Sequence, residues 1–548
     1  MKQFFTLLCC LAVAYTQAQP VPVFTGYDLN TGPTQSSGPS AFVKLGNKFV
    51  FSAFTDVAGR ELWISDGTTA GTMQLADVWP GSNSSIPVPF AALGTKVIFA
   101  AETANGIEPW VTDGTTAGTQ ILKDINPGAG SSFNSYSFAV FNGKIYFTAT
   151  DGTNGVELWA TDGTTAGTQM VKDILPGATG SMAAYPTICN GSLFFIADDG
   201  INGTELWATD GTQLGTTMVK NIAPGSASST PVSLTAIGNT LYFSATTAAT
   251  GYELWTSDGT TAGTQMIKDI IPGATGSINY TIFAPYSGKT YFRASDGFNG
   301  LELWTTDGTE AGTQMVKDIN IGAGNSYPGP YCVYNNKLYF LANDGINGYE
   351  LWVSDGTTAG TQMFKDLNPG ANDASPDKMF VYKKHMYFTA VQNPLGRQFW
   401  MSDGTATGTK IIAPPIAPIS HPANGSEFFL FDQDSALYVS AYFTSAGREL
   451  WSIKDTTSYP NSISSITSQN AFTIYPNPSD GMFTLQLENI NFQHGSITVY
   501  DVTGKLVYMQ KEIPKTPIHK VKIDTPKGIY LLKLQLDDAI QTKQIVIE

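Results

Sequence analysis

The chain contains few basic residues, and only four histidines and four cysteines. It has 30 Lys and Arg against 45 Asp and Glu, which gives a formal net charge of −15. A nucleic-acid-binding protein needs a basic surface that displaces counterions from phosphates, so we expect no nucleic acid partner. The histidines show no metal-ligand spacing, and the sequence has no phosphate loop or nucleophile elbow.

The sequence also lacks an apolar run long enough to cross a bilayer. The N-terminal run Phe4 to Val13 is too short for a membrane anchor. It follows Lys2 and precedes small residues, which is the pattern of an export signal. We therefore expect cleavage after Ala18, no membrane span in the mature chain, and a secreted or cell-surface location.

Two cysteines lie outside this signal segment. Cys189 and Cys332 belong to repeats three apart, on strands that we expect to be distant. A disulfide requires Cα atoms within about 7 Å of each other. We therefore predict two buried free thiols.

What the chain does contain is a repeat. Nine of its ten tryptophans occur in copies of one phrase, clearest at residues 157–168, and they are 47 to 51 residues apart. A fixed period near 48 residues indicates a repeat architecture. The motif tryptophans are Trp63, Trp110, Trp159, Trp207, Trp255, Trp304, Trp352, Trp400 and Trp451.

Each repeat predicts four short antiparallel strands. In the third repeat, turn residues such as Asn142-Gly143 separate segments rich in β-formers. Leu158 and Trp159 place large apolar side chains on both faces of one strand, so both faces of the sheet must be covered. Sheets stacked around an axis provide this cover, so we predict an all-β fold with a large β-propeller of four-stranded blades. The predicted strands of this repeat are 138–141, 144–149, 157–161 and 168–174.

We predict nine blades in a ring that the N-terminal strand closes. The last copy, at 449–451, has no fourth strand after it, whereas residues 23–29 match a fourth strand with nothing before it. Pairing the two removes open sheet edges. An eight-bladed ring with a displaced ninth unit, or an open solenoid, is the alternative. The predicted parts are a signal segment 1–18, the propeller 19–455, a Ser/Thr-rich linker 456–470 and a small C-terminal β-sandwich 471–548.

The repeated phrase carries a family resemblance. Its Asp-Gly-Thr turn, in which Asp can accept backbone hydrogen bonds, resembles the structural Asp-box hairpin of sialidase propellers. The elements Glu-Leu-Trp, Asp-Gly-Thr, Ala-Gly-Thr and Lys-Asp-Ile recur in order. With them, residues 20–455 resemble the ELWxxDGT-repeat family of secreted bacterial proteins. This resemblance implies a secreted or surface propeller and no known reaction.

Residues that recur in every repeat are interpreted as structural. We expect the motif tryptophans to pack in the core, the recurring glutamates to be structural, and the Lys-Asp pairs of the fourth strands to form ion pairs between blades. Departures from the repeat are the candidate ligand-binding residues. They are Trp79, Arg60, Arg397 and Arg448.

Four turns of the form Asp-Gly-x-Asn-Gly are candidate calcium sites, because they bring oxygen ligands together. Calcium takes six to eight oxygens and each turn supplies roughly three, so an Asx-type hairpin turn is the competing interpretation. We expect no other cofactor. The candidate calcium ligands are Asp151, Asn154, Asp199, Asn202, Asp296, Asn299, Asp344 and Asn347.

Beyond the linker the period stops, and alternating segments predict strands at 483–487, 496–500, 528–534 and 544–547. Three ordered phrases resemble the type A C-terminal sorting domain of the type IX secretion system of Bacteroidetes. The resemblance implies export through that machinery, followed by surface attachment or release. The motif residues are Tyr475, Pro476, Asn477, Pro478, Gly481, Asp501, Gly504, Lys505, Gly528, Tyr530 and Lys543.

Taken together, these features favour an exported, non-enzymatic scaffold that binds a protein or a glycan at the cell surface. An extracellular glycan-active enzyme, hydrolase or lyase, is one alternative, because every blade offers carboxylates. A self-associating surface or matrix component is another.

Overall fold

The computed structural model describes residues 22–31, 36–133, 135–278, 280–412, 428–431, 436–444, 447–454, 472–477, 479–487, 494–501, 505–536 and 539–547. The chain divides into two compact units, Val21–Asp455 and Thr456–Glu548 with Met1–Pro20. The predicted signal segment, its cleavage site, the linker 456–470, Pro478 and Gly504 lie outside the described residues. No helix within these ranges has the length and apolarity of a membrane span.

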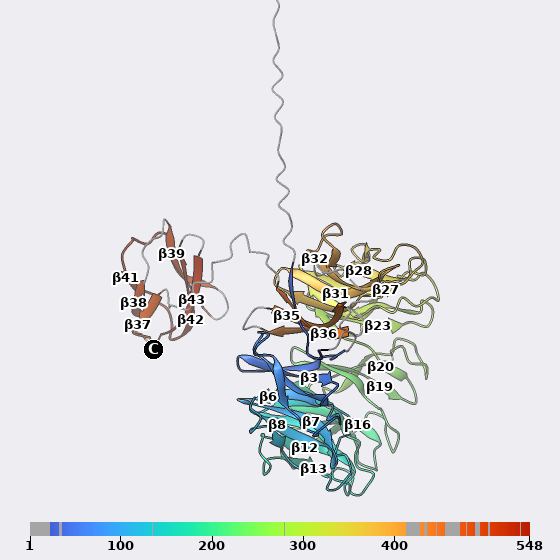
Figure 1. Cartoon of the computed structure of the whole chain (residues 1–548). Coiled ribbons are helices and arrows are strands. Elements are labelled where there is room, and N and C mark those ends of the chain that lie inside the picture. The colour runs from blue at the N-terminus through green and yellow to red at the C-terminus, as the bar shows by residue number, and fades with distance from the viewer. Residues whose placement is uncertain are drawn as a thin grey trace, which may run out of the picture. The chain divides into compact units, whose positions relative to one another are not determined.

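The first unit contains nine four-stranded antiparallel sheets (Figure 1). Eight follow chain order and are numbered here as blades 1 to 8. Blades 1 to 4 are β2 (Ser40–Leu45), β3 (Lys48–Thr55), β4 (Gly59–Ser65), β5 (Met73–Ala76); β6 (Val88–Leu93), β7 (Lys96–Thr103), β8 (Gly106–Thr112), β9 (Gln120–Ile121); β10 (Phe138–Phe141), β11 (Lys144–Thr150), β12 (Val156–Thr161), β13 (Gln169–Lys172); and β14 (Ala184–Cys189), β15 (Ser192–Asp198), β16 (Thr204–Thr209), β17 (Thr217–Lys220). Blades 5 to 8 are β18 (Val232–Ile237), β19 (Thr240–Thr247), β20 (Gly251–Ser257), β21 (Gln265–Lys268); β22 (Ala284–Tyr286), β23 (Lys289–Ser295), β24 (Leu301–Thr306), β25 (Gln314–Lys317); β26 (Tyr331–Tyr334), β27 (Lys337–Asn343), β28 (Tyr349–Ser354), β29 (Gln362–Lys365); and β30 (Asp377–Tyr382), β31 (His385–Gln392), β32 (Gly396–Ser402), β33 (Lys410–Ile412).

The ninth sheet joins the two ends of the unit. Its order is β1 (Val23–Tyr27), β36 (Gly447–Lys454), β35 (Ala436–Thr444) and β34 (Phe428–Phe431). β1 runs antiparallel to β36, from Val23 opposite Lys454 to Tyr27 opposite Leu450. The prediction of nine blades closed by the N-terminal strand is therefore confirmed. We call this ninth blade the closing sheet.

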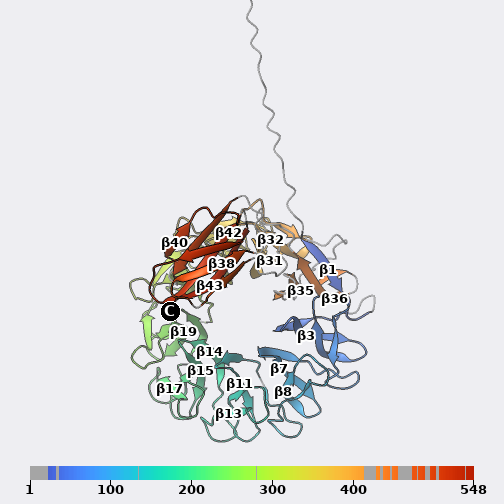
Figure 2. The same ribbon diagram turned by 90° about the vertical axis from the view of Figure 1, so that its left-hand side faces the viewer.

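The blades surround a central axis (Figure 2), and their first strands lie nearest to it, because the first strands of neighbouring blades approach one another. Adjacent apolar residues on each third strand pack in opposite directions. Leu158 belongs to a buried cluster with blade 4, whereas Trp159 belongs to a cluster with blade 2. Eight motif tryptophans are only 3–7% exposed, as predicted for core residues, and Trp110 is partly buried.

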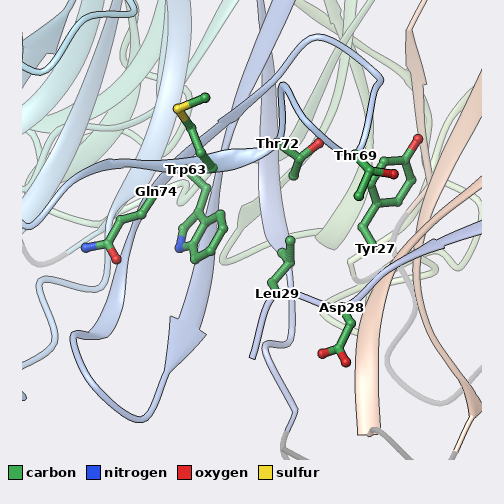
Figure 3. A pocket seen from close by; sticks show the side chains of 8 residues that line it. Tyr27, Asp28, Leu29, Trp63, Thr69, Thr72 and Gln74 are labelled. Atoms are coloured by element: carbon green, nitrogen blue, oxygen red, sulfur yellow. The ribbon is translucent and has the colours of Figure 1, made fainter. Parts of the chain in front are cut away.

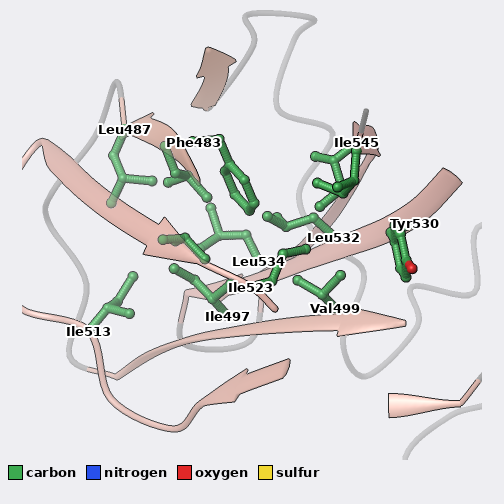
Figure 4. Close-up of a cluster of buried hydrophobic side chains, with 13 residues drawn as sticks. Phe483, Leu487, Ile497, Val499, Ile513, Ile523, Tyr530, Leu532, Leu534 and Ile545 are labelled. Carbon is green, nitrogen blue, oxygen red and sulfur yellow. The ribbon is translucent and has the colours of Figure 1, made fainter. Parts of the chain in front are cut away.

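The second unit has two sheets. One contains β37 (Phe472–Tyr475), β38 (Met482–Leu487) and β41 (Ile518–Lys522); the other contains β40 (Leu506–Gln510), β39 (Gly495–Asp501), β42 (Gly528–Leu536) and β43 (Ala539–Ile547). Side chains of both sheets, including Phe483, Val499 and Leu532, form a buried apolar core (Figure 4). The predicted sandwich is confirmed, and β37, β40 and β41 are strands that the sequence reading missed.

One cysteine prediction needs correction. Both thiols are free, and Cys189 is buried, but Cys332 is only partly buried. Cys332 lies on β26, a first strand, and packs against the edge of a buried cluster that includes Tyr334 and Tyr339. Its partial burial still raises the pKa of the thiol to about 11.

Candidate functional site

The propeller has two chemically different ends. Because the strands alternate in direction, the turns between second and third strands lie at the same end as the loops that lead from one blade to the next. We call this end the loop face. A side chain at Gly155, in such a turn, would place its Cβ 2.2 Å from the backbone nitrogen of Gly180 in the connecting loop. The close approach of the two loops therefore requires glycine.

The recurring glutamates hold the connecting loops in place. Glu302 is fully buried and accepts hydrogen bonds from the Ile319 nitrogen at 2.7 Å and from the Ser326 nitrogen and hydroxyl at 3.1 and 2.6 Å. Burial raises the pKa of Glu302 to about 7, although these hydrogen bonds act in the opposite direction. These carboxylates thus accept hydrogen bonds inside the propeller wall, which agrees with the prediction that they are structural. The same position is occupied by Glu61, Glu108, Glu157, Glu205, Glu253, Glu350 and Glu449.

The candidate calcium ligands lie in turns on the loop face. Asp151 Oδ1 accepts hydrogen bonds from the backbone nitrogens of Thr153 and Asn154, and its Oδ2 accepts one from Asn154 Nδ2 at 2.9 Å. Burial alone would raise the pKa of Asp151, but these hydrogen bonds lower it overall. The turns at Asp199, Asp296 and Asp344 have the same pattern. Within the described ranges, no group of three or more His, Cys, Asp or Glu side chains is arranged to hold a metal ion, and calcium binding stays a prediction.

The candidate arginines lie in the wall of the propeller. Arg60 Nη1 donates to the Gly38 carbonyl at 2.9 Å, and Arg397 Nη1 donates to the equivalent Ser375 carbonyl at 3.1 Å. Both therefore hold a connecting loop. Arg448 binds the same kind of loop through its backbone, because its carbonyl accepts a hydrogen bond from the Gly38 nitrogen. Trp79 is partly buried in the loop that leads from blade 1 to blade 2.

The opposite end carries the Asp-Gly-Thr turns. Asp162 Oδ1 accepts hydrogen bonds from the Thr164 hydroxyl and nitrogen at 2.6 and 2.9 Å, which lower the pKa of Asp162. A Cβ at Gly167 would lie 2.1 Å from the same carboxylate oxygen, so the Ala-Gly-Thr glycine makes room for the aspartate. These aspartates are engaged in shaping the turn, as their resemblance to structural Asp-box hairpins implied.

The predicted Lys-Asp ion pairs between blades are wrong. The lysines do cross to the next blade, but Lys172 Nζ donates to the Thr216 carbonyl at 2.7 Å and lies 5.8 Å from the centroid of Trp207. The sequence placed Asp beside Lys, but adjacent residues of a strand point to opposite faces. A main-chain carbonyl and an indole face hold the ammonium group instead. The other lysines with this carbonyl bond are Lys123, Lys220, Lys268, Lys317 and Lys365.

Exposed apolar side chains gather on the loop face. Phe298, Ile346 and Ile201, each the variable residue of an Asp-Gly-x-Asn-Gly turn, are 81%, 74% and 72% exposed. Sequence reasoning missed them, although an apolar residue at the tip of a hairpin turn is a readable signal. On the opposite end, Leu214 is exposed on an Asp-Gly-Thr turn, and the adjoining strand ends expose Met73, Ile121, Val140, Ile188, Val333 and Val381 by 37–51%. Other exposed apolar residues of the loop face are Val57, Ile86, Tyr136, Met182, Tyr280, Ile282, Ile321, Tyr327 and Leu395.

Some of these side chains are held in a strained backbone conformation. Ile86, Met182 and Tyr327 occupy one repeat position, directly after the serine bound by the buried glutamate, and have φ values of 44°, 53° and 47°. Positive φ is rare for such residues and costs about 1–3 kcal/mol each. Their backbone nitrogens bind the start of a third strand, as Ile86 does to the Arg60 carbonyl at 3.2 Å. The fold therefore fixes these side chains outward on the loop face.

In the second unit, the predicted motif residues fasten the last strand. Asn477 Oδ1 accepts a hydrogen bond from the Val546 nitrogen at 2.8 Å. Gly481 has a φ of 94°, and a Cβ there would lie 2.6 Å from the Ile523 carbonyl oxygen. Asp501 and Lys505 close a turn, and the Tyr530 hydroxyl donates to the Pro526 carbonyl at 2.7 Å. Pro476 lines a surface pocket of about 300 Å³, while Gly528 and Lys543 lie on β42 and β43.

The fold defines a class: a β-propeller protein with a small C-terminal β-sandwich. Residues 473–548 match the family of secretion system C-terminal sorting domains. The match confirms the predicted sorting domain, which implies interaction with the type IX secretion machinery and a secreted or cell-surface location. No curated protein matches the chain.

Three solved structures are similar to the chain at low identity. PorZ, an essential bacterial surface component of the type IX secretion system of Porphyromonas gingivalis, is 14% identical with a TM-score of 0.36, over 93% of this chain and 75% of that one. The β-propeller domain of the Trilobed protease from Pyrococcus furiosus is 9% identical with a TM-score of 0.34, over 70% and 100%. Sqt1 of Saccharomyces cerevisiae is 9% identical with a TM-score of 0.35, over 80% and 99%. The propeller assignment rests on the strand pairing rather than on these similarities.

Proposed function

We propose that the protein is a non-enzymatic binding scaffold of the cell surface, whose loop face holds a protein or glycan ligand. The distribution of exposed apolar side chains supports this proposal. Isolated apolar residues are ordinary on a protein surface, but a concentration of them on one end is typical of an interaction surface. The positive φ of this repeat position turns Ile86, Met182 and Tyr327 outward at the same end.

The proposal also takes up two finer inferences from the sequence. We propose that residues 1–18 direct export and are removed after Ala18, and that the propeller is of the ELWxxDGT-repeat kind. The ordered recurrence of the motif elements supports the second inference. Deletion of residues 472–547 should leave the protein inside the cell envelope, which immunoblots of cell fractions would measure.

A comparison of the two ends of the ring tests the binding role. The full mature chain would be screened on arrays of glycans and of purified surface proteins from the same organism, with and without calcium. The triple variant Ile201→Ser, Phe298→Ser, Ile346→Ser alters the loop face, and Leu214→Ser is the matched control on the opposite end. Selective binding that the triple variant loses and the control keeps is the expected result. Equal loss in both variants, or no selective binding by the wild-type chain, would contradict the proposal.

A further inference from the structure

The fourth-strand lysines that cross between blades occupy one repeat position, and other residues take this position at three interfaces in or next to blade 1 and the closing sheet. Six interfaces carry a lysine whose Nζ lies 2.5–2.9 Å from a threonine carbonyl of the next blade. In five of them the Nζ is 5.6–5.9 Å from the centroid of the next blade's motif tryptophan. The carbonyl and the indole face therefore form a repeated ammonium site.

Strand register shows which residues take the lysine position elsewhere. Lys172 lies opposite Leu158, the residue before the motif tryptophan. At the other three interfaces, the residue opposite the equivalent position is Ile412 (opposite Phe399), Tyr27 (opposite Leu450) or Ala76 (opposite Leu62). Ile412 packs in a buried cluster with Trp451, and Ala76 packs in one that includes Trp110. At these two interfaces an apolar contact has replaced the lysine.

At the interface between the closing sheet and blade 1, Tyr27 takes the lysine position and packs in a buried cluster with Trp63, and a pocket lies beside it (Figure 3). The Tyr27 hydroxyl donates to the Gly67 carbonyl at 2.8 Å rather than to Thr72. β1 also lacks the bulge that inserts an extra residue in β13, and Gly26 pairs with Trp451. The pocket has a volume of about 330 Å³, and its lining includes Tyr27, Asp28, Leu29, Trp63, Thr72 and Gln74.

We propose that this pocket binds the ammonium group of a lysine side chain from a partner protein. Trp63 and Thr72 are the counterparts of Trp207 and Thr216, which hold the Lys172 ammonium group in blade 4. Asp28 is exposed at the pocket and adds a carboxylate, and Leu29 supplies an apolar wall for the aliphatic stem. The formal net charge of −15 favours a cationic partner.

This site is distinct from the loop face, so the two proposals fail or succeed separately. The pocket lies where fourth strands meet the Asp-Gly-Thr turn of blade 1, and none of the exposed loop-face residues lines it. The proposed ligand, an ammonium group, follows from the six lysine sites between the blades. It does not follow from the exposed apolar residues of the loop face. Among the interfaces described, the lysine position holds an ammonium group at six and a guanidinium group at none.

Ligand-observed saturation-transfer NMR on the full mature chain tests the site. The probes are Nα-acetyl-lysine methylamide, its norleucine analogue and n-butylammonium. We expect saturable transfer to the lysine probe and none to the norleucine analogue. Equal transfer to the norleucine analogue would overturn the proposal, and binding of n-butylammonium without the lysine probe would assign the site to free amines instead.

Two variants and a control locate the binding. Asp28→Asn should weaken the lysine probe roughly fivefold, whereas Asp124→Asn, at the same repeat position beside the occupied Lys123 site, should leave its affinity unchanged. Tyr27→Lys supplies the missing lysine within the chain and should abolish probe binding. If Tyr27→Lys fails to fold, the pair Asp28→Asn and Asp124→Asn decides the matter, and equal affinity in both would sink the proposal.

Discussion

Six blade interfaces carry a lysine across to the next blade, whereas the two interfaces of the closing sheet carry isoleucine or tyrosine at that position, and the interface between blades 1 and 2 carries alanine. For the closing sheet, the difference goes with a difference in how the blade is built. Blades 1 to 8 are continuous in the chain, but the closing sheet pairs residues more than 400 positions apart, as Glu449 does with the Ser37 nitrogen. The repeat motif thus predicts how each blade is built, but not which residues close the ring.

The closing sheet is held instead by its buried glutamate. Glu449 accepts hydrogen bonds from the Leu29 nitrogen at 3.0 Å and from the Ser37 nitrogen and hydroxyl at 2.9 and 2.5 Å. In blade 3, Glu157 makes the same kind of contacts within one continuous segment. The recurring glutamate therefore joins neighbouring segments of the chain in blade 3, and it joins the two ends of the propeller in the closing sheet.

The largest expected effect comes from removing these glutamates. Glu449→Ala and Glu157→Ala each leave buried donors without an acceptor, which costs about 3 kcal/mol or more. Glu449→Ala should lower the urea midpoint further, because it also releases the strand that closes the ring. Tryptophan fluorescence during urea unfolding measures both. An equal or larger loss in Glu157→Ala would show that closure does not depend on Glu449.

Crowding β1 against its partner should have the next largest effect. A Cβ at Gly26 would lie 2.8 Å from the ring of Trp451, so Gly26→Val should cost about 1–3 kcal/mol and detach β1. Limited proteolysis within residues 22–31 measures the detachment. Thr25→Val, on the exposed neighbouring residue, is the control and should resist proteolysis as the wild type does.

Exchanging residues between the two kinds of interface should have a smaller effect. Lys172→Met removes a charged hydrogen bond and a cation–π contact, and we expect a loss of about 1–2 kcal/mol. The reverse change, Ala76→Lys, places a lysine beside Trp110 and should raise the unfolding midpoint. Thermal unfolding measures both. If both variants lower the midpoint, each interface is packed for the residue that it already has, and a lysine at position 76 does not stabilise the ring.

The smallest effect per residue is a pH dependence. Burial raises the pKa values of Glu108, Glu302 and Glu350 to about 7. Between pH 4.5 and 7 the folded state then binds more protons than the unfolded state, so stability falls as pH rises through this window, by at most about 1.4 kcal/mol per pH unit for one glutamate. The thermal midpoint should decrease from pH 5 to pH 8, and Glu302→Gln should flatten the curve. A midpoint that rises with pH would contradict these pKa shifts.

Strand positions and blade number could be predicted because they depend on local patterns. The predicted strands of the third repeat correspond to β10 to β13 within two residues at each end, since turn residues bound each apolar segment. The missing fourth strand after Trp451 and the surplus strand at the N-terminus likewise predicted closure. In the tail, β37, β40 and β41 escaped because they are short and their alternation is weak.

The side-chain partners could not be predicted in the same way. Lys172 was predicted to form an ion pair with an aspartate of a neighbouring blade, but its acceptor is a carbonyl 44 residues away in the next blade. Arg60 and Arg397 stood out as departures from the repeat, yet both bind loop carbonyls within the wall. A departure from a motif signals a changed contact, and only the packing of neighbouring blades shows whether that contact is internal.

The sequence by itself determined the repeat, the four-stranded blade, the closure of the ring and the sorting domain, because each follows from periodicity, turn chemistry or a local motif. The tertiary structure decided which residues carry the interfaces. It turned Glu449 into a link between the chain ends, gathered apolar turn residues on one end of the ring, and left a pocket beside Trp63 where Tyr27 replaces lysine. These features depend on distances between blades, which no local pattern encodes.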